Sequence, residues 1–211
     1  MHIAEIWRYP IKSLAGTSLR ESEITRLGVS HDREIVVVRD DQMVTARRYP
    51  KLLGLHGEID SNGVPTINGH PWESSEARAL IQEAVDGGPV RLVRLPGPER
   101  FDVLPLLVAT DGAIAQIGVD GRRFRPNIVI GGVPELEERA WPGKRIQVGP
   151  VLIAVAQLRQ RCVMTTYDPD TQVQNLNVLR RIVSEFEGTM ALDCSVIMPG
   201  TIRVGDAVKI I

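Results

Sequence analysis

The residue with the most obvious chemical potential in this sequence is a cysteine beside arginines. Cys162 ends the segment Arg159-Gln160-Arg161-Cys162, directly after an apolar stretch. Cationic neighbours stabilise a thiolate, which is a nucleophile and a ligand for soft metals. Hydroxyls and carboxylates in the following segment, Val163 to Thr171, can supply hydrogen bonds and a proton. The residues alone equally permit an inert buried cysteine followed by a turn at Asp168-Pro169.

The other residues that commonly bind metals or cofactors form no recognisable pattern. Cys194, before an apolar run, has the character of a free buried cysteine. Neither cysteine belongs to a C-x-x-C pair, and the four histidines lack metal-ligand spacing. Phosphate-binding, dinucleotide-binding, zinc-protease and serine-hydrolase motifs are absent. We therefore expect no chain-borne iron–sulfur cluster, flavin or NAD site, and any redox chemistry would need electrons from another protein.

Composition excludes several classes of partner. The chain has 211 residues, 25 Lys plus Arg, 26 Asp plus Glu and a net charge of -1. This balance, with only 4% aromatic residues, argues against a nucleic-acid binder. No apolar run is long enough to span a bilayer, and Met1 to Glu5 do not resemble the start of a secretory signal. We expect a cytoplasmic location, with no nucleic-acid and no membrane partner.

Hydrophobic periodicity predicts a mainly β (α+β) fold. Helical spacing predicts amphipathic helices over about 75–86 and 176–186, and a short helix over 111–117 that begins at Thr110 or Asp111. Alternating or β-branched runs predict the strands 3–7, 35–38, 43–47, 52–59, 90–95, 104–109, 128–130 and a pair within 146–158. Many short strands with few helices favour a β-barrel or closed sheet with helices at its edges.

One break in the pattern suggests how the chain is divided. Pro96-Gly97-Pro98 combines the two residue types that most often interrupt regular structure. We predict an N-terminal region over 1–96 and a second domain over 97–211, which share one core.

Five segments, in order along the chain, resemble one family. The segment 161–171 resembles the cysteine segment of MOSC-domain proteins, the homologues of the C-terminal part of molybdenum cofactor sulfurase, which include the mitochondrial amidoxime-reducing component. The other four matching segments are 9–16, 43–47, 124–132 and 199–206. The resemblance implies a MOSC-type β-barrel over 97–211, preceded by a smaller MOSC N-terminal β-barrel-like region over 1–96, with one cofactor site between them.

The resemblance also implies a cofactor and the residues that hold it. Cys162 would ligate the molybdenum of Mo-molybdopterin, and guanidinium groups would bind the phosphate and pterin oxygens through paired hydrogen bonds. The residues implied for cofactor binding are Lys12, Ser13, Arg33, Arg47, Thr110, Arg125, Asn127 and Arg161.

Most of these residues also have an ordinary structural explanation. Isolated basic residues are usually solvated surface charges, and Arg47 fits a surface pair at a strand end. Asn127 can form a turn after Pro126, and Thr110 can cap a helix. Asp168, the candidate proton donor, can equally be an Asx-turn residue.

The function implied is a molybdenum-dependent oxidoreductase. It would remove oxygen from small N-hydroxylated substrates, with Cys162 and Asp168 as catalytic residues and electrons from a separate reductase. Two alternatives stay open. One is a sulfur carrier, with a persulfide on Cys162, in molybdenum cofactor sulfuration. The other is a non-catalytic molybdopterin carrier.

Overall fold

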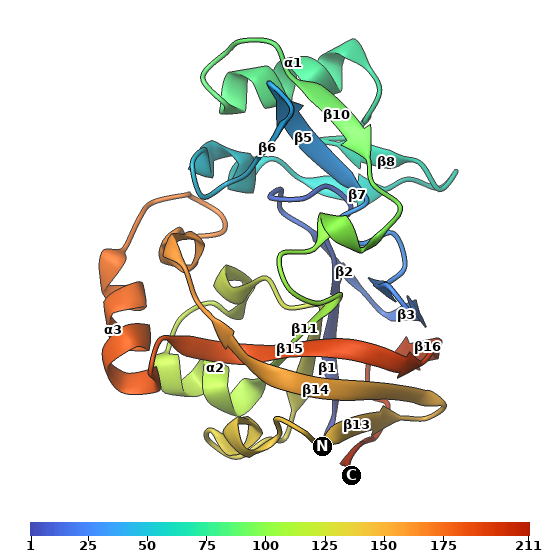
Figure 1. The fold of residues 1–211 in the computed structure, drawn as a ribbon, viewed down its shortest axis with the longest axis vertical. Coiled ribbons are helices and arrows are strands. Elements are labelled where there is room, and N and C mark those ends of the chain that lie inside the picture. The colour runs from blue at the N-terminus through green and yellow to red at the C-terminus, as the bar shows by residue number, and fades with distance from the viewer.

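The computed structural model describes residues 1–211 as mostly strands, with three α-helices (Figure 1). The largest sheet has eight strands in the order β17-β13-β14-β15-β11-β12-β1-β2. Most pairs are antiparallel, and β11 and β12 run parallel. These strands are β1 (His2–Arg8), β2 (Thr17–Leu19), β11 (Leu106–Thr110), β12 (Ile128–Gly131), β13 (Arg145–Val148), β14 (Val151–Gln160), β15 (Thr189–Met198) and β17 (Val208–Ile210).

Strand pairing does not close this sheet into a barrel. Its edges are β17 and β2, and they do not pair with each other. The segment that leads into β17 contacts the start of β1 through an isolated bridge between His2 and Ala207 and through three backbone hydrogen bonds: Ile3 N to Asp206 O at 2.9 Å, Gly205 N to Ile3 O at 2.8 Å and Val208 N to Met1 O at 3.0 Å. The predicted mainly β fold with a few helices is therefore confirmed, while the predicted closed barrel is not.

Three smaller sheets complete the β structure. One has the order β10-β5-β6, from β5 (Ile35–Arg39), β6 (Gln42–Val44) and β10 (Arg91–Arg94). Another has the order β7-β8-β9, from β7 (Gly57–Ile59), β8 (Pro65–Ile67) and β9 (His70–Pro71). These two, with α1 (Ser75–Ala84), form the upper part in Figure 1. The third has the order β16-β3-β4, from β3 (Glu21–Thr25), β4 (Gly28–Val29) and β16 (Gly200–Arg203).

The buried apolar side chains form two large cores, one in the upper part and one around the large sheet, which we call the lower part. The lower core has 20 buried residues, and it includes Ile3, Ile6 and Ile24 from the start of the chain. The upper core has 14 buried residues, and Met164 from the second half packs against it. Each half of the sequence thus contributes to the packing of both parts. The division after residue 96 stays a prediction.

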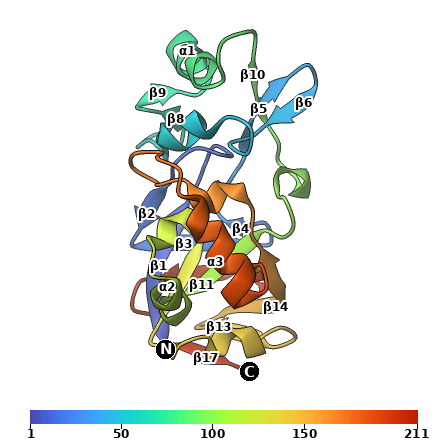
Figure 2. The same cartoon turned by 90° about the vertical axis from the view of Figure 1, so that its left-hand side faces the viewer.

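The helices begin where side-chain caps predict. Ser74 accepts a hydrogen bond from Ala77 N at the start of α1, and Thr110 does the same from Ala113 N at the start of α2 (Asp111–Ile117). Asn175 caps α3 (Leu176–Phe186). A third apolar cluster joins α2 and α3, which lie on the same side of the large sheet (Figure 2). None of these helices has the length and apolar character needed to cross a membrane.

Two predicted strands are partly wrong, and the one predicted over 43–47 ends at Val44. The segment 52–59 forms a strand only from Gly57, because Pro50–Gly54 is a 3-10 helix that buries Leu52 and Leu53. Proline fixes the backbone angle that begins such a turn, and an apolar pair fits a short helix as well as a strand. Four further 3-10 helices occur, at Pro98–Arg100, Gly121–Phe124, Glu137–Ala140 and Val163–Thr166.

Candidate functional site

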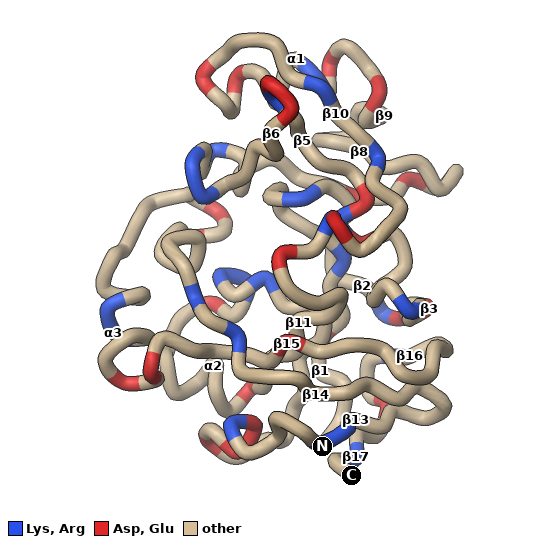
Figure 3. Tube along the Cα trace, viewed as in Figure 1, with Lys and Arg blue, Asp and Glu red and all other residues tan.

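A cleft between the upper and lower parts brings together segments from across the chain. Its empty volume is about 820 Å³ when the solvent at its mouth is included. Basic segments lie on both sides of this region (Figure 3). The lining residues are Lys12, Ser13, Arg33, Thr45, Arg47, Phe101, Asp102, Val103, Leu104, Leu107, Arg123, Phe124, Arg125, Asn127, Arg159, Gln160, Arg161, Cys162, Met164 and Asp193.

The cleft has a strong excess of positive charge. Seven of its lining residues are Lys or Arg and two are Asp. Because the chain as a whole has a net charge of -1, this excess is local to the cleft. A concentrated positive lining raises the local concentration of anions.

Loops at strand ends position most of these side chains. Lys12 and Ser13 follow β1, where Ile11 bridges to Ile35. Ser13 and Arg33 have left-handed φ angles of 75° and 55°. Arg125 also has a left-handed φ of 56°, directly after the 3-10 helix at 121–124. Non-glycine residues rarely adopt this conformation, and such residues cluster at functional sites.

Two arginines of the cleft lack any carboxylate partner. Arg125 lies over the ring of Tyr9, with 4.3 Å from its guanidinium carbon to the ring centroid, and its Nη2 is buried without a hydrogen-bond acceptor. Arg161 donates from Nη2 to Phe124 O at 2.8 Å, while its Nε is buried without an acceptor. Neither Arg125 nor Arg161 forms an ion pair in the structure. Each instead has a positive neighbour, Arg33 beside Arg125 and Arg159 beside Arg161.

Burial of these two guanidinium groups is electrostatically unfavourable. Desolvation lowers the pKa of Arg125 and of Arg161 to about 10, and nearby positive charges also act in that direction. Buried N–H groups of native proteins almost always have an acceptor. A bound anion would supply both the missing acceptors and the missing negative charge.

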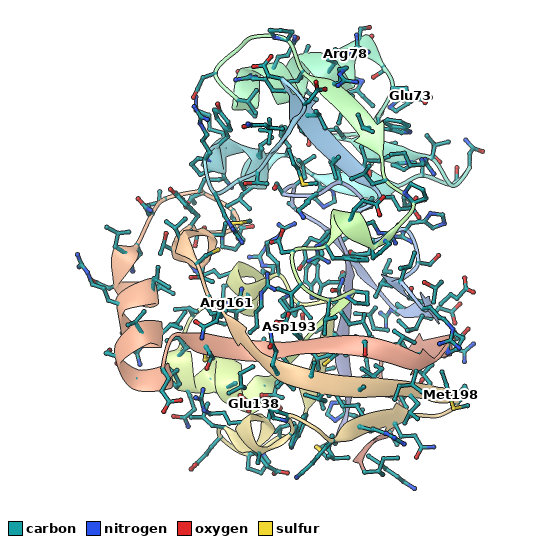
Figure 4. All side chains as sticks on the ribbon, in the orientation of Figure 1. Glu73, Arg78, Glu138, Arg161, Asp193 and Met198 are labelled. Atoms are coloured by element: carbon teal, nitrogen blue, oxygen red, sulfur yellow. The ribbon has the colours of Figure 1, made fainter.

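The remaining basic residues of the cleft already have partners. Lys12 Nζ lies 2.8 Å from Asp102 Oδ1, and Arg159 Nη1 donates to Asp193 Oδ1 at 3.2 Å. Asp193 is 2% exposed, so Arg159 compensates a buried carboxylate. Figure 4 labels Asp193, on β15 of the large sheet, and Arg161, and both line the cleft. Arg33 pairs with the buried Asp32.

Cys162 is the one cysteine on the cleft. It is a free, partly exposed cysteine at the start of the 3-10 helix Val163–Thr166. Its carbonyl accepts hydrogen bonds from Thr165 N at 3.1 Å and Thr165 Oγ1 at 2.9 Å, which fix the turn. Cys194 is fully buried, and this burial raises the pKa of its thiol. The two cysteines are therefore in opposite environments, and only Cys162 is available to a ligand.

The structure brings together eight of the ten site residues predicted from the sequence. All eight line the cleft, although some are also used in local structure: Lys12, Ser13, Arg33, Arg47, Arg125, Asn127, Arg161 and Cys162. Ser13 Oγ accepts a hydrogen bond from Ala46 N at 3.1 Å. Asn127 accepts from Leu107 N and from Arg33 Nη1, both at 3.2 Å, so its amide oxygen is already satisfied.

Thr110 and Asp168 lie outside the cleft lining, so their parts in cofactor binding and proton transfer stay predictions. Thr110 is fully buried, and it caps α2 and donates to Glu138 Oε2 at 3.2 Å. Asp168 Oδ1 accepts hydrogen bonds from Asp170 N and Thr171 N, which is an Asx turn. The backbone N–H of Thr171 and the other donors keep the pKa of Asp168 below its ordinary value, so it is a poor proton donor near neutral pH.

A substitution at Thr110 separates a structural role from cofactor binding. Thr110→Val removes both the helix cap and the partner of a buried carboxyl, so we expect a loss of about 2 kcal/mol in unfolding free energy. Thr110→Ser keeps the hydroxyl and should be nearly neutral. Denaturant unfolding measures the loss, and the cofactor content of folded Thr110→Val should equal that of the wild type. A lower cofactor content in the folded variant would show that Thr110 also acts in cofactor binding.

Several cleft residues were not among those predicted. Arg159 lies two positions before Arg161 at the end of β14. Because side chains two positions apart in a strand share a face, this spacing indicates that Arg159 faces the same site as Arg161. Arg123 immediately precedes a family-like segment, and its Nη2 donates to Asp168 Oδ2 at 2.9 Å. Asp102 and Asp193 reach the cleft only through tertiary folding.

A second cavity adjoins the cleft. Its empty volume is about 1,140 Å³ including open solvent, and Arg123, Arg125 and Met164 line both spaces. Trp7 and Tyr9, whose rings stack with centroids 6.5 Å apart, lie on its wall. No group of three or more His, Cys, Asp or Glu side chains in the structure is placed to hold a metal ion. A metal in the cleft would therefore need ligands from a cofactor besides Cys162.

The fold and the cleft together define a class: a mainly β protein with a cleft that is lined by cationic side chains and carries one accessible thiol. The chain belongs to the MOSC family. The family model of the MOSC domain matches residues 108–209, and that of the MOSC N-terminal beta barrel domain matches residues 1–94.

Named relatives agree with this assignment. Human mitochondrial amidoxime reducing component 2 is 27% identical, over 98% of this chain and 82% of its own. The molybdenum cofactor sulfurase of Caenorhabditis briggsae is 23% identical, over 84% of this chain but only 30% of its own. Among solved structures, the YUAD protein of Bacillus subtilis matches with a TM-score of 0.55 and 12% identity, over 99% of this chain and 94% of that chain, which supports the fold alone.

Proposed function

We propose that the cleft binds the molybdenum cofactor, with Cys162 as a metal ligand. The observation that carries the proposal is that Arg125 and Arg161, beside the one accessible thiol, each have one buried guanidinium nitrogen without an acceptor. A phosphorylated pterin has anionic and polar oxygens, which can accept hydrogen bonds from these N–H groups. The names of the relatives, amidoxime reducing components and a molybdenum cofactor sulfurase, support the same cofactor.

The residues of the cleft suit the parts of this cofactor. Arg125 and Arg161 would donate hydrogen bonds to phosphate or pterin oxygens, and a guanidinium fork can do so in pairs. Lys12 would add a point charge at the cleft wall. The thiolate of Cys162 is a soft ligand, as molybdenum with dithiolene sulfurs requires. When bound, the cofactor supplies a two-electron redox centre, which no residue of the chain can provide.

The finer proposal is an oxidoreductase that removes oxygen from N-hydroxylated compounds. It rests on the relatives named amidoxime reducing components, which the chain matches over almost its whole length. In this proposal a separate reductase supplies electrons. The chain's own part is to hold the cofactor, orient it through Arg125 and Arg161, and leave the Cys162 side open to a small substrate. Because Asp168 is held in a turn and ionised, the proton for the departing hydroxyl would come from another group or from water. Placement in the cytoplasm also stays a prediction.

Analysis of the isolated protein tests cofactor binding. We expect protein produced in a host that makes the cofactor to contain about one molybdenum and one molybdopterin per chain, measured by elemental analysis and by fluorescence of the oxidised pterin. Protein from a host unable to synthesise the cofactor should contain neither. Absence of both from the first preparation, with the protein folded, contradicts the proposal.

Sulfur transfer is the second candidate function, because an accessible thiol beside cationic groups can also carry a persulfide. Incubation of cofactor-free protein with a cysteine desulfurase and cysteine distinguishes the two. A sulfur adduct on Cys162 in protein that never acquires molybdenum favours the carrier. Turnover of a hydroxylamine by the loaded protein with an artificial reductant favours the oxidoreductase and excludes a purely storage role.

A further inference from the structure

The carboxylate of Asp102 lies among three positive side chains of the cleft. Its Oδ1 is 2.8 Å from Lys12 Nζ, and its Oδ2 is 3.4 Å from Arg47 Nη2 and 3.5 Å from Arg159 Nη2. The three cations come from the loop after β1, the turn after β6 and the end of β14, so they converge only in the folded protein. A group of three converging cations is a site for an anion with several oxygens.

Asp102 has no other side-chain bond to hold it there. It lies on the connection between the 3-10 helix Pro98–Arg100 and β11, and all three of its contacts are to these cations. Its side chain is 43% exposed, so rotation toward solvent is open to it. The loop itself is anchored independently, because Arg100 O accepts from Lys12 Nζ at 2.7 Å and Arg100 Nη1 donates to Pro96 O at 3.2 Å.

We propose that Asp102 is an internal anion of the cleft, which a phosphate-bearing ligand displaces, so that only a ligand with more charge and more acceptor oxygens than a carboxylate binds strongly. A carboxylate presents two oxygens and one negative charge. A phosphate monoester presents three oxygens and nearly two charges at neutral pH. Only the dianion therefore gains charge and hydrogen bonds when it replaces Asp102 among Lys12, Arg47 and Arg159. A monoanion exchanges one negative charge for another and gains little.

The electrostatics of the ligand-free protein agree with this role. Partial burial alone would raise the pKa of Asp102, but the hydrogen bond from Lys12 and the charges of Lys12, Arg47 and Arg159 outweigh it and keep this pKa below its ordinary value. Asp102 is therefore ionised at neutral pH and reduces repulsion among the three cations. The same carboxylate thus stabilises the empty cleft and competes with the ligand.

This dual role predicts two effects of opposite sign from one substitution. In cofactor-free protein, Asp102→Asn should lower the thermal midpoint by about 2–4 °C, because the three cations lose their shared carboxylate. The same change should tighten the binding of inorganic phosphate roughly tenfold. Nitrate affinity should rise by a similar factor, because a displaced carboxylate competes equally with every anion that takes its place, so the ratio of phosphate to nitrate affinity should stay the same. Asp102→Ala, which also removes any contact that the asparagine side chain keeps, should show the same fall in thermal midpoint and the same tighter phosphate binding.

The experiment uses the full chain from a host without the cofactor, with phosphate and nitrate titrated at constant ionic strength by calorimetry. Glu185→Gln is the matched control, since Glu185 also pairs with an arginine, Arg181 at 2.9 Å, but on the outer surface of α3. This control should leave both anion affinities unchanged. Unchanged or weaker phosphate binding in both Asp102 variants overturns the proposal and makes Asp102 an ordinary member of the cleft wall.

The inference rests on the proposed function only for the identity of the natural ligand. Phosphate titration tests Asp102 without the cofactor, whereas the molybdenum and pterin content of wild-type protein tests cofactor binding without any variant. Failure of one therefore leaves the other intact, and the two failures are distinguishable.

Discussion

Cys162→Ala is expected to reduce the molybdenum content of protein from a cofactor-producing host at least about tenfold. Cys162 is the one cysteine on the cleft, and the two carboxylates there, Asp102 and Asp193, are engaged with cations. Met164 also lines the cleft, but its neutral thioether does not supply the negative charge of a thiolate ligand. Pterin should be lost less completely than metal, because Arg125 and Arg161 remain. Elemental analysis and pterin fluorescence measure the two quantities on the same sample.

Cys194→Ala is the control for this prediction. Cys194 is fully buried in the lower core, so its replacement leaves a small cavity and changes stability rather than metal content. Molybdenum per folded chain should stay near the wild-type value in this variant. Equal molybdenum in wild-type and Cys162→Ala protein would remove Cys162 from the metal site and leave sulfur transfer as the better explanation of its exposure.

Arg125→Met should separate ligand binding from stability. The loss of a buried positive charge that faces the ligand is expected to weaken anion binding by about 2–4 kcal/mol, or roughly 30- to 700-fold. The ligand-free protein should be as stable as the wild type or more stable. The reason is that the pKa of Arg125 is lowered to about 10 in the folded state, so folding at neutral pH disfavours its charged form. Methionine can fill the space over Tyr9 without that cost.

Two further variants complete this test. Arg125→Lys keeps a charge but loses the planar fork, so its anion affinity should lie between those of wild type and Arg125→Met. Arg180→Met alters an exposed arginine on α3 that bonds only to Asn177, and it should change neither property. Phosphate calorimetry and denaturant unfolding supply the two readouts. A large loss of stability in Arg125→Met, with anion binding preserved in the folded fraction, would show that Arg125 is a structural residue held by Tyr9.

Local patterns were sufficient for most of the elements. The β-branched run at Ile35 to Val38 forms β5, and the cap at Thr110 begins α2 at the predicted residue. These succeed because periodicity and capping depend on neighbours within a few residues. The failures occurred where local signals were ambiguous. Leu52 and Leu53 fit a strand or a short helix equally, and only their packing into the upper core decides for the helix.

The closed barrel is a failure of a different kind. Strand content and spacing predict how much β structure forms, but closure depends on whether the two edges of the sheet meet in register. Here β17 and β2 do not pair, and the last segment of the chain instead contacts the start of β1, at the bridge between His2 and Ala207 and at neighbouring backbone hydrogen bonds. A contact between residues so far apart in sequence leaves no periodic signal.

The sequence by itself determined a mainly β chain of the MOSC family with an arginine-flanked cysteine, because these depend on local composition and on recognisable segments. It also identified eight residues that the fold gathers into one cleft. Tertiary structure alone decided which side chains still lack partners. Thr110 and Asp168 are used in structural hydrogen bonds. Arg125 and Arg161 have buried donors without acceptors. Asp102 places a carboxylate among the cations of the cleft. The physical reason is that desolvation and pairing depend on which distant segments pack together, and a residue's type does not carry that information.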